Sequence, residues 1–333
     1  MPINAKAPTI YDVADQAGVS ISTISRMLND PEKVNPATRE KIMEVIDRLG
    51  FVPKAEARAR ALKINRRIGV ITPFFTAPSF VQRLRGITGA LASEKYELVV
   101  YSVESTEQFA NYINNISLAR NLDGLIVMSL PISDEQLARL QGLPVVLVEY
   151  RNNNVSCIEI DDVAGGKMAA NYLIGKGHRR IAFIGDSDLP EFSIQPVSKR
   201  LKGFKSAMAA AGLEVPEELV ALVPYTQEAT RAAANEWLQM ANPPSAIFAA
   251  TDFQALSLLK TMHRAGVQVP QQLAIVGFDN LDLAEYADLT TISQHLDESG
   301  TVAVEVLLNR INDPGRPVQH INLPLSIIER ETA

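Results

Sequence analysis

From Ile68 onward, short apolar runs alternate with stretches of helical periodicity. The runs are, in chain order, IGVI, ELVVY, DGLIVM, PVVLVEY, RIAFIGD, SAIFAATD and LAIVGFD. Strands that alternate with helices form βαβ units and parallel sheets. So many strands spread over residues 68–333 predict two α/β lobes rather than one.

Polar and aromatic side chains follow these predicted strands. Ligands of open α/β sheets bind beyond the carboxyl ends of the strands. The residues at these ends are Phe74, Phe75, Ser79, Phe80, Ser129, Glu149, Asp186, Thr251, Asp252, Phe278 and Asp279. Carboxylates accept hydrogen bonds from hydroxyls and aromatic rings stack on apolar sugar faces, so this set favours a neutral polyol or sugar. An Asp at a strand end can equally be the N-cap of the next helix.

Residues 1–50 predict three short helices. Thr9 and Asp12 have the spacing of a capping box, and Ser20 can cap a second helix. Asn35 and Pro36 are typical of the start of a third helix. The second helix carries a row of small polar side chains on its outer face, and that row calls for a hydrogen-bonding partner.

Charge is unevenly divided between the two parts of the chain. Residues 1–67 hold 12 Lys+Arg against 8 Asp+Glu, whereas residues 68–333 hold 20 against 30. A basic head on an acidic body indicates a polyanionic partner for the head. Residues 51–67 are rich in Lys, Arg and Ala and cannot bury themselves, so they predict a linker or a helix that forms on a partner.

Several classes of protein are disfavoured by the composition. Cys157 is the sole cysteine and the four histidines are scattered, so neither a disulfide framework nor a metal cluster is expected. No secretory signal and no membrane-spanning apolar run is recognised, so a cytoplasmic protein is expected. Tyr172 and Lys176 have the spacing of a short-chain dehydrogenase pair, but no GxGxxG opens a helix. We therefore expect no enzyme and no cofactor.

The stretch TIYDVADQAGVSISTISRMLNDPEKVNPATREKIMEVIDRLGFVP resembles the headpiece of the lac-repressor (LacI/GalR) family of bacterial transcription regulators. The later stretches HRRIAFIGD, RLKGF, AIFAATD, VPQQLAIVGFDN and LTTISQ resemble that family's effector-binding core in the same order. The resemblance implies an all-α helix-turn-helix headpiece over residues 1–52 and a hinge helix over 53–67. A two-lobed, periplasmic-binding-protein-like α/β core follows over 68–333, with a first lobe of about 68–162 plus 293–328 and a second lobe of about 163–292.

By this resemblance the second helix is a recognition helix for the major groove of operator DNA. Ile21, Ser22 and Arg26 fall at base-reading positions, and the Arg26 guanidinium suits guanine. Phosphate contacts are implied for Thr9, Tyr11, Ser20, Thr23, Ser25, Asn29, Asn35 and Thr38. In the hinge, Ala57, Arg60 and Leu62 are expected at the minor groove. The family's wedging leucine is replaced by Arg60, so either Leu62 wedges in a shifted register or Arg60 enters the groove.

The resemblance also implies an effector site in the core. Its expected members are Ser79, Phe80, Glu149, Arg200, Tyr225, Thr251, Phe278, Asp279 and Gln294. Ile194 and Pro196 stand where purine-binding members need polar groups, so a sugar is favoured over a purine or phosphorylated co-effector. The family further implies a homodimer on a pseudo-palindromic operator. A solute-binding protein or an enzyme on the same α/β core is the more distant alternative, because neither uses a DNA-binding headpiece.

Overall fold

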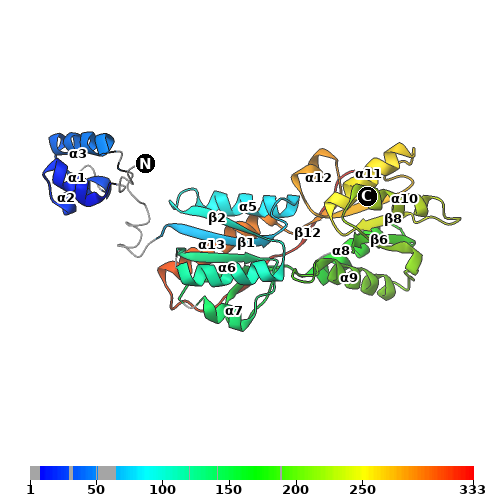
Figure 1. The fold of residues 1–333 in the computed structure, drawn as a ribbon. Helices are drawn as coiled ribbons and strands as arrows, with labels where there is room; N and C mark the ends of the chain where they lie inside the picture. The colour runs from blue at the N-terminus through cyan, green and yellow to red at the C-terminus, as the bar shows by residue number, and fades with distance from the viewer. Residues whose placement is uncertain are drawn as a thin grey trace, which may run out of the picture. The chain divides into compact units, whose positions relative to one another are not determined.

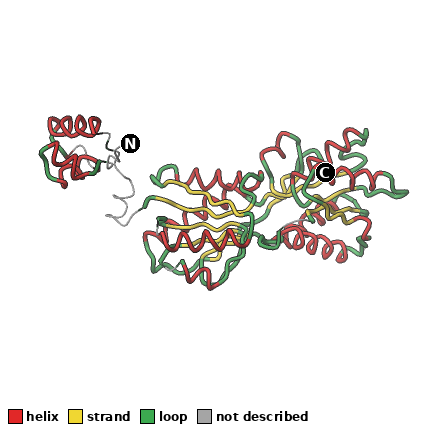
Figure 2. The backbone as a smooth tube through the Cα atoms, in the orientation of Figure 1, coloured by secondary structure: helices red, strands yellow, loops and turns green. Residues whose placement is uncertain are grey.

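The computed structural model describes residues 8–29, 33–49, 51, 65–119, 121–140, 142–187 and 190–333. The chain divides into two compact units, Met1–Asn65 and Arg66–Ala333, which are treated separately below as the headpiece unit and the core unit. Figure 1 labels their helices and strands, and Figure 2 shows that the headpiece unit is all-helical whereas the core unit mixes helix and strand.

The headpiece unit holds helices α1 (Ile10–Ala17), α2 (Ile21–Asn29) and α3 (Pro36–Leu49). Thr9 and Asp12 form the predicted capping box at the start of α1. Gly18 has a φ of 63°, a left-handed conformation that suits glycine, and it ends α1 so that α2 can turn away. Val13, Ile24 and Ile42, one from each helix, are fully buried and bring the three helices onto one small core.

The first lobe of the core unit is built on a six-stranded parallel sheet with the order β11-β5-β4-β3-β1-β2. Its strands are β1 (Arg67–Pro73), β2 (Glu97–Val103), β3 (Gly124–Met128), β4 (Val145–Val148), β5 (Ser156–Glu159) and β11 (His320–Asn322). Helices α5 (Pro78–Leu91) and α13 (Leu296–Asn312) share one apolar cluster with the sheet. Helices α6 (Thr106–Ala119) and α7 (Asp134–Arg139) contribute to the cluster on its other face.

The second lobe repeats this plan with the strand order β12-β10-β9-β8-β6-β7. Its strands are β6 (Ile181–Asp186), β7 (Val220–Val223), β8 (Ala246–Ala249), β9 (Ala274–Asp279), β10 (Thr291–Ser293) and β12 (Ser326–Ile328). Helices α8 (Asp162–Gly175) and α9 (Pro196–Ala210) cover one face, and α10 (Gln227–Leu238) and α11 (Asp252–Arg264) cover the other. The short helices η2 (Glu217–Leu219) and α12 (Asp282–Tyr286) precede β7 and β10.

One predicted boundary is wrong. Residues up to 328 were expected in the first lobe, but Ser326–Ile328 forms β12 and pairs antiparallel with β10 in the second sheet. The physical reason is that β10 would otherwise present an unpaired edge, which the returning chain covers. Within the described residues the chain thus passes between the lobes after β5, after β10 and after β11.

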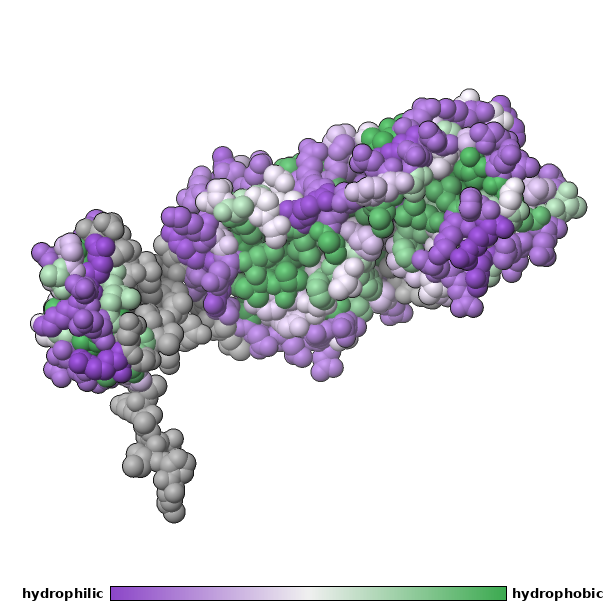
Figure 3. Space-filling view, turned by 90° about the horizontal axis from the view of Figure 1, so that it is seen from above, coloured by the Kyte–Doolittle hydropathy of each residue, from purple (hydrophilic) through white to green (hydrophobic). Residues whose placement is uncertain are grey.

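Several large apolar side chains of the core unit are exposed. They are Val81 on α5, Val100 on the edge strand β2, Leu222 on the edge strand β7, and Leu283 and Tyr286 on α12. Figure 3, in which the molecule of Figure 1 is seen from above, shows exposed apolar areas on both lobes of the core unit. Contiguous exposed apolar surface is typical of a protein contact.

Candidate nucleic-acid interface and ligand site

Helix α2 has two distinct faces. Ile24 and Met27 are buried in the headpiece core, whereas Ile21, Ser22 and Arg26 are exposed. The exposed trio holds the three residues predicted to read bases. An apolar side chain, a hydroxyl and a guanidinium on one exposed helix can contact a thymine methyl group, base edges and guanine, respectively.

Three of the predicted phosphate contacts begin helices. Besides Thr9 on α1, the Ser20 hydroxyl accepts from the backbone N–H of Thr23 at 3.2 Å. The Asn35 side chain accepts from the backbone N–H of Ala37 at 3.0 Å. These side chains therefore cap helices, and helix starts of this kind offer backbone N–H groups to a phosphate. The phosphate role itself stays a prediction.

The remaining predicted DNA contacts are less informative. Tyr11 is exposed, and Thr23, Ser25 and Thr38 are half-buried. The Asn29 side chain lies outside the part of the chain that the structure describes, as do Ala57, Arg60 and Leu62. The choice between Arg60 and Leu62 at the minor groove is therefore a prediction still.

In the first lobe, Glu149 follows β4 and is held by two donors. Arg83 on α5 donates from Nη2 to Glu149 Oε1 at 2.5 Å, and the Ser129 hydroxyl donates to Oε2. Glu149 and Ser129 have φ values of 64° and 55°, so both strand ends turn through the left-handed region. Such conformations are uncommon outside glycine and are typical of functional sites.

In the second lobe, Arg200 on α9 is buried and makes two hydrogen bonds within the protein. Its Nε donates to Asp162 Oδ1 at 2.9 Å and its Nη1 to the carbonyl oxygen of Ala250 at 2.7 Å. Its guanidinium lies 3.6 Å from the centroid of the Phe278 ring. Gly166 allows this arrangement, because a Cβ there would lie 2.0 Å from the Arg200 carbonyl oxygen.

Asp279 and Gln294 form the other half of this group. Gln294 Nε2 donates to Asp279 Oδ1 at 2.5 Å, and Arg200 Nη1 stands 3.7 Å from the same oxygen. The Gln294 Oε1 atom is buried without a hydrogen-bond partner. A buried acceptor without a donor is costly, and a ligand hydroxyl would satisfy it.

The acids of the two lobes are coupled through their charges. Burial raises the pKa of Asp279 to about 6, although Arg200 and Gln294 act to lower it and Glu149 raises it further. Burial also opposes the charge of Glu149, but Arg83, Ser129 and the more distant Arg200 keep the pKa of Glu149 below its ordinary value. The predicted residues Glu149, Arg200, Asp279 and Gln294 therefore belong to one electrostatic group.

Other predicted members have structural roles as well. Thr251 is the N-cap of α11, and its neighbour Asp252 is buried, accepting from Thr291 Oγ1 at 2.5 Å and from the Leu281 N–H at 2.8 Å. The cap of the helix at this strand end is therefore Thr251 and not the aspartate that follows it. Phe278 is fully buried under Arg200, so its ring face orients the arginine.

The predicted effector residues at the start of α5 and before α10 are more exposed to solvent than Arg200, Phe278 and Asp279. Ser79 and Phe80 are half-buried, with Phe80 edge-on to Phe74 at 6.1 Å between ring centroids. Tyr225 stacks on Phe253 with centroids 4.6 Å apart and remains partly exposed.

Two members of the group were missed by the sequence reasoning. Arg83 has a sequence signal, since it lies between Phe80 and Ile87 at helical spacing and therefore on the apolar stripe of α5. Asp162 follows Asp161, the N-cap of α8, and nothing in the sequence separates the two carboxylates. Only the fold shows that Asp162 turns to Arg200.

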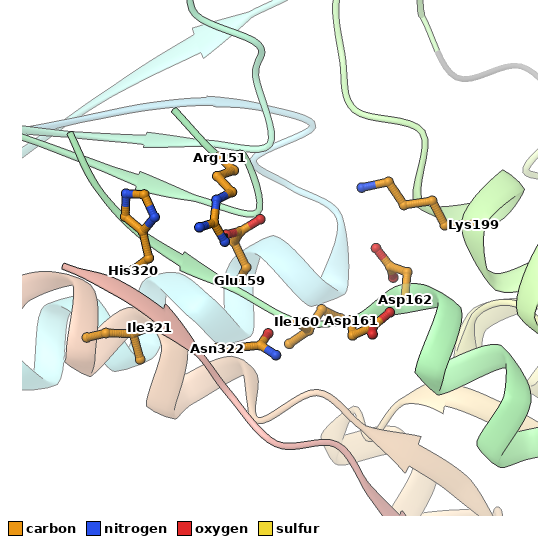
Figure 4. Close-up of a pocket in the computed structure, with 9 residues that line it drawn as sticks. All are labelled: Arg151, Glu159, Ile160, Asp161, Asp162, Lys199, His320, Ile321 and Asn322. Atoms are coloured by element: carbon orange, nitrogen blue, oxygen red, sulfur yellow. The ribbon is translucent and has the colours of Figure 1, made fainter. Parts of the chain in front are cut away.

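A polar cavity of about 250 Å³ lies beside this group where the chain passes between lobes. It is lined by Arg151, Glu159, Ile160, Asp161, Asp162, Lys199, His320, Ile321 and Asn322. Figure 4 shows Arg151 and Glu159 on one side of it and Lys199 and Asp162 on the other. None of the predicted effector residues lines this cavity. Its link to the group is Asp162, which lines the cavity and accepts a hydrogen bond from Arg200.

In the described part of the chain no three His, Cys, Asp or Glu side chains gather as a metal site, and no helix is both long and apolar enough for a bilayer. Tyr172 donates to the carbonyl oxygen of Ala333 and Lys176 pairs with Glu329, so this pair ties the C-terminal segment to α8.

Comparison with known families and proteins covers both units. Residues 9–54 match the family described as bacterial regulatory proteins, lacI family, and residues 170–333 match a periplasmic binding protein-like domain. Catabolite control protein A of Priestia megaterium is 32% identical over 332 residues, covering 97% of this chain and 98% of that protein. The ribose operon repressor of Escherichia coli strain K12 is 32% identical over 333 residues, covering 98% and 99%.

Solved structures of transcriptional regulators are also similar to this chain over nearly its whole length. A complex of the transcriptional regulator CelR with cellobiose has a TM-score of 0.69 and 29% identity, covering 98% of this chain and 100% of that chain. A lac repressor bound to ONPG has a TM-score of 0.80 and 25% identity, again covering 98% and 100%.

Proposed function

The chain belongs to the lacI family of bacterial regulatory proteins, and from that membership we propose that it represses transcription from an operator under the control of a sugar. The headpiece binds operator DNA and the core unit binds the sugar between its lobes. The protein acts by binding rather than by catalysis.

The exposed face of α2 supports the DNA-binding half of this proposal. Arg26 reads a guanine through its paired N–H donors, and Ile21 and Ser22 contact neighbouring base edges. The helix starts at Thr9, Ser20 and Asn35 bind phosphates and set the register. Phosphate contacts make the affinity fall steeply with salt.

The observation that carries the ligand half is the coupled group of Glu149, Arg83, Arg200, Asp279 and Gln294. Two guanidinium groups stand against the carboxylates of Glu149, Asp162 and Asp279, so the group holds no surplus positive charge for an anionic ligand. Its acceptors, including the unpartnered Gln294 Oε1, suit the hydroxyl groups of a neutral sugar.

A purine is the second candidate, and one observation favours it. The stacked rings of Tyr225 and Phe253 lie beside the Thr251 cap and offer an aromatic face that a planar base can extend. A purine would then use Asp279 and Arg200 as hydrogen-bond partners. Stacking on Tyr225 would contribute more to the binding of a planar purine than to the binding of a sugar.

We further propose a homodimer formed by the exposed apolar side chains of the core unit. Val81, Val100, Leu222, Leu283 and Tyr286 come from both lobes, and two of them lie on edge strands. A dimer presents two headpieces to a pseudo-palindromic operator. Tyr286 is 86% exposed, so Tyr286→Asp should yield monomers by light scattering while leaving the fold intact.

The sugar controls DNA binding by favouring one arrangement of the lobes. It can shift the equilibrium only by its difference in affinity for the two arrangements, typically about 1–3 kcal/mol. A change in the arrangement of the lobes reaches the residues that precede β1 through the chain segments that connect the lobes.

A two-stage experiment tests the proposal. A thermal-shift screen of the full chain uses D-ribose, cellobiose, other sugars, sugar phosphates and purine bases, since a ligand of the folded state raises its stability by mass action. Fluorescence anisotropy with operator candidates then follows DNA binding with and without the hit. We expect a neutral sugar to shift the melting temperature and change operator affinity. A response confined to purines would establish the second candidate, and a chain that binds no DNA would refute the repressor function.

Arg26→Ala supplies the test of base reading. Losing a bidentate guanine contact should cost about 1–3 kcal/mol of discrimination at one position of each half-site. Arg48→Ala is the matched control, because Arg48 donates to Gln16 within the headpiece at 3.2 Å. An unchanged preference at every operator position in Arg26→Ala would contradict the assignment.

A further inference from the structure

Arg83 is a charged side chain in the interior of the first lobe. It is 2% exposed and is among the largest fully buried side chains of the described residues. Helices α5 and α13 approach closely around it, because a Cβ at Gly300 would lie 2.2 Å from the Arg83 carbonyl oxygen and one at Gly86 would lie 2.0 Å from that of Asp297. The close approach brings Ser299 of α13 against the guanidinium.

The two hydrogen bonds of Arg83 are fixed in direction. Its Nε donates to Ser299 Oγ at 2.8 Å, and its Nη2 donates to Glu149 Oε1 at 2.5 Å. The Ser299 hydroxyl in turn donates to the carbonyl oxygen of Leu296 at 2.7 Å, so its oxygen is left to accept from Arg83. The guanidinium is therefore anchored on α13 and aimed at Glu149.

Glu149 depends on this arrangement for its charge. A carboxylate buried without a partner takes up a proton, because the low-dielectric interior penalises the ionised form. Arg83 and Ser129 each bond one of the two Glu149 oxygens, which leaves the other lone pairs of both oxygens to accept from a ligand.

We infer that Arg83 is a positioning residue for the effector, which keeps Glu149 ionised and oriented as an acceptor on the first-lobe side of the site. The inference rests on the proposed sugar-binding function, and it assigns the role to a residue that contacts the site only through Glu149. With Arg83 removed, Glu149 becomes a neutral acid that donates a proton where the effector hydroxyl needs an acceptor.

The charged and titratable groups around Glu149 come from several elements. Arg83 on α5 and the Ser129 hydroxyl after β3 contact it directly. Arg200 on α9 favours its charge from farther away. Glu149 in turn raises the pKa of Asp279 after β9 and of Asp162 on α8, so both carboxylates lie within electrostatic reach of it. Of the two arginines, only Arg83 contacts the Glu149 carboxylate.

The test measures the protonation of Glu149 without any ligand. Urea unfolding of the full chain is followed at pH 5 and pH 8 for wild type, Arg83→Met, Glu149→Gln and the double variant. In Arg83→Met the folded pKa of Glu149 rises above its unfolded value, so the stability loss relative to wild type grows as pH rises. Comparing the double variant with Glu149→Gln should show a loss that depends less on pH, because only the weaker effect of Arg83 on the pKa of Asp279 remains.

Two further variants separate charge from packing. Arg83→Lys retains a cation and should show nearly the same pH dependence of the unfolding midpoint as wild type. Arg67→Met is the matched control, since it removes a more exposed pair with Glu97 in the same lobe. A stability loss in Arg83→Met that is equal at pH 5 and pH 8, or that keeps its full pH dependence after Glu149→Gln, would overturn the inference.

The ligand is added in a separate arm, with D-ribose and cellobiose as probes. We expect the sugar-induced thermal shift to be lost in Arg83→Met at pH 8 and kept in Arg83→Lys. If neither probe shifts wild type or any variant, the proposed function is weakened, whereas the unfolding data still decide the charge state of Glu149.

Discussion

The two lobes each bury an arginine among carboxylates, but they use it differently. In the first lobe, Arg83 donates directly to Glu149, and the pKa of Glu149 lies below its ordinary value although burial opposes this. In the second lobe, Arg200 gives its hydrogen bonds to Asp162 and the Ala250 carbonyl, and it stands 3.7 Å from Asp279. Burial then raises the pKa of Asp279 to about 6.

The contrast shows that the same lobe architecture holds one acid, Glu149, ionised and leaves the other, Asp279, to titrate near pH 6. A direct ion pair holds Glu149 charged throughout the physiological range. Asp279 is coupled to a guanidinium that is already committed elsewhere, so its proton is exchanged near neutrality. A ligand that joins the lobes meets a permanent acceptor on one side and a titratable one on the other.

Breaking the second-lobe pair should have the largest effect. Arg200→Met leaves Asp162 and Asp279 buried without their cation, and loss of one partner of a buried pair costs about 3–5 kcal/mol. Urea unfolding measures the loss, and Lys199→Met is the control because it removes an exposed cation from the same helix. Equal stability of the two variants would show that Arg200 is not needed to balance these acids.

Asp279→Asn should remove the response to ligand while the headpiece still binds operator. A hydrogen bond to a charged group contributes about 1.5–3 kcal/mol, so ligand affinity should fall roughly 10- to 100-fold. Calorimetry with the screened ligand measures the change. Asp288→Asn is the control, since Asp288 is exposed in the same lobe. If Asp279→Asn binds the ligand as wild type does, Asp279 is not a contact.

The pH dependence of stability should have opposite signs in the two lobes. The folded pKa of Asp279 is raised, so its stabilising contribution is present below the unfolded pKa and is lost as pH rises toward about 6. The slope between these values is about −1.4 kcal/mol per pH unit. Glu149 has a lowered folded pKa, so its contribution is present at neutral pH and is lost on acidification.

Unfolding of wild type, Asp279→Asn and Glu149→Gln across pH 4–7 separates the two contributions. We expect the difference in free energy of unfolding between wild type and Glu149→Gln to become smaller as pH falls. The free energy of unfolding of wild type relative to Asp279→Asn should instead increase as pH falls. Parallel curves for the two variants would remove the distinction between the lobes.

The smallest effect is expected for the exposed link between the lobes. Arg85 on α5 pairs with Asp297 of α13 at 2.7 Å and with Asp282 of α12, and Gln82 Nε2 donates to the Asn280 carbonyl oxygen at 3.3 Å. Exposed ion pairs contribute about 0.2–1 kcal/mol. Arg85→Ala should therefore lower the free energy of unfolding by less than about 1 kcal/mol. In 0.5 M salt most of this loss should disappear, because salt screens exposed charges. A loss as large as that of Arg200→Met would place the main interlobe coupling at the surface instead.

Much of this architecture was predictable from local patterns. Alternating apolar runs predicted the parallel strands of both sheets, and Thr9 with Asp12 predicted the start of α1, because these signals depend on neighbours in sequence. Glu149 and Asp279 were found because parallel strands end at one edge of a sheet. The rule failed at Asp252, whose carboxylate is used to hold Thr291 and the Leu281 N–H. It also gave no sign that β12 would close the edge of β10.

The sequence by itself determined the two kinds of unit, the family and the positions of the main acids, since periodicity and strand ends are local properties of the chain. The tertiary structure decided which arginine each acid meets. Arg83 reaches Glu149 because α5 and α13 pack closely at Gly86 and Gly300. Arg200 reaches Asp162 because α8 and α9 meet at Gly166. These partners are far apart in sequence, and the charge of each acid follows from contacts that exist only after the helices have packed.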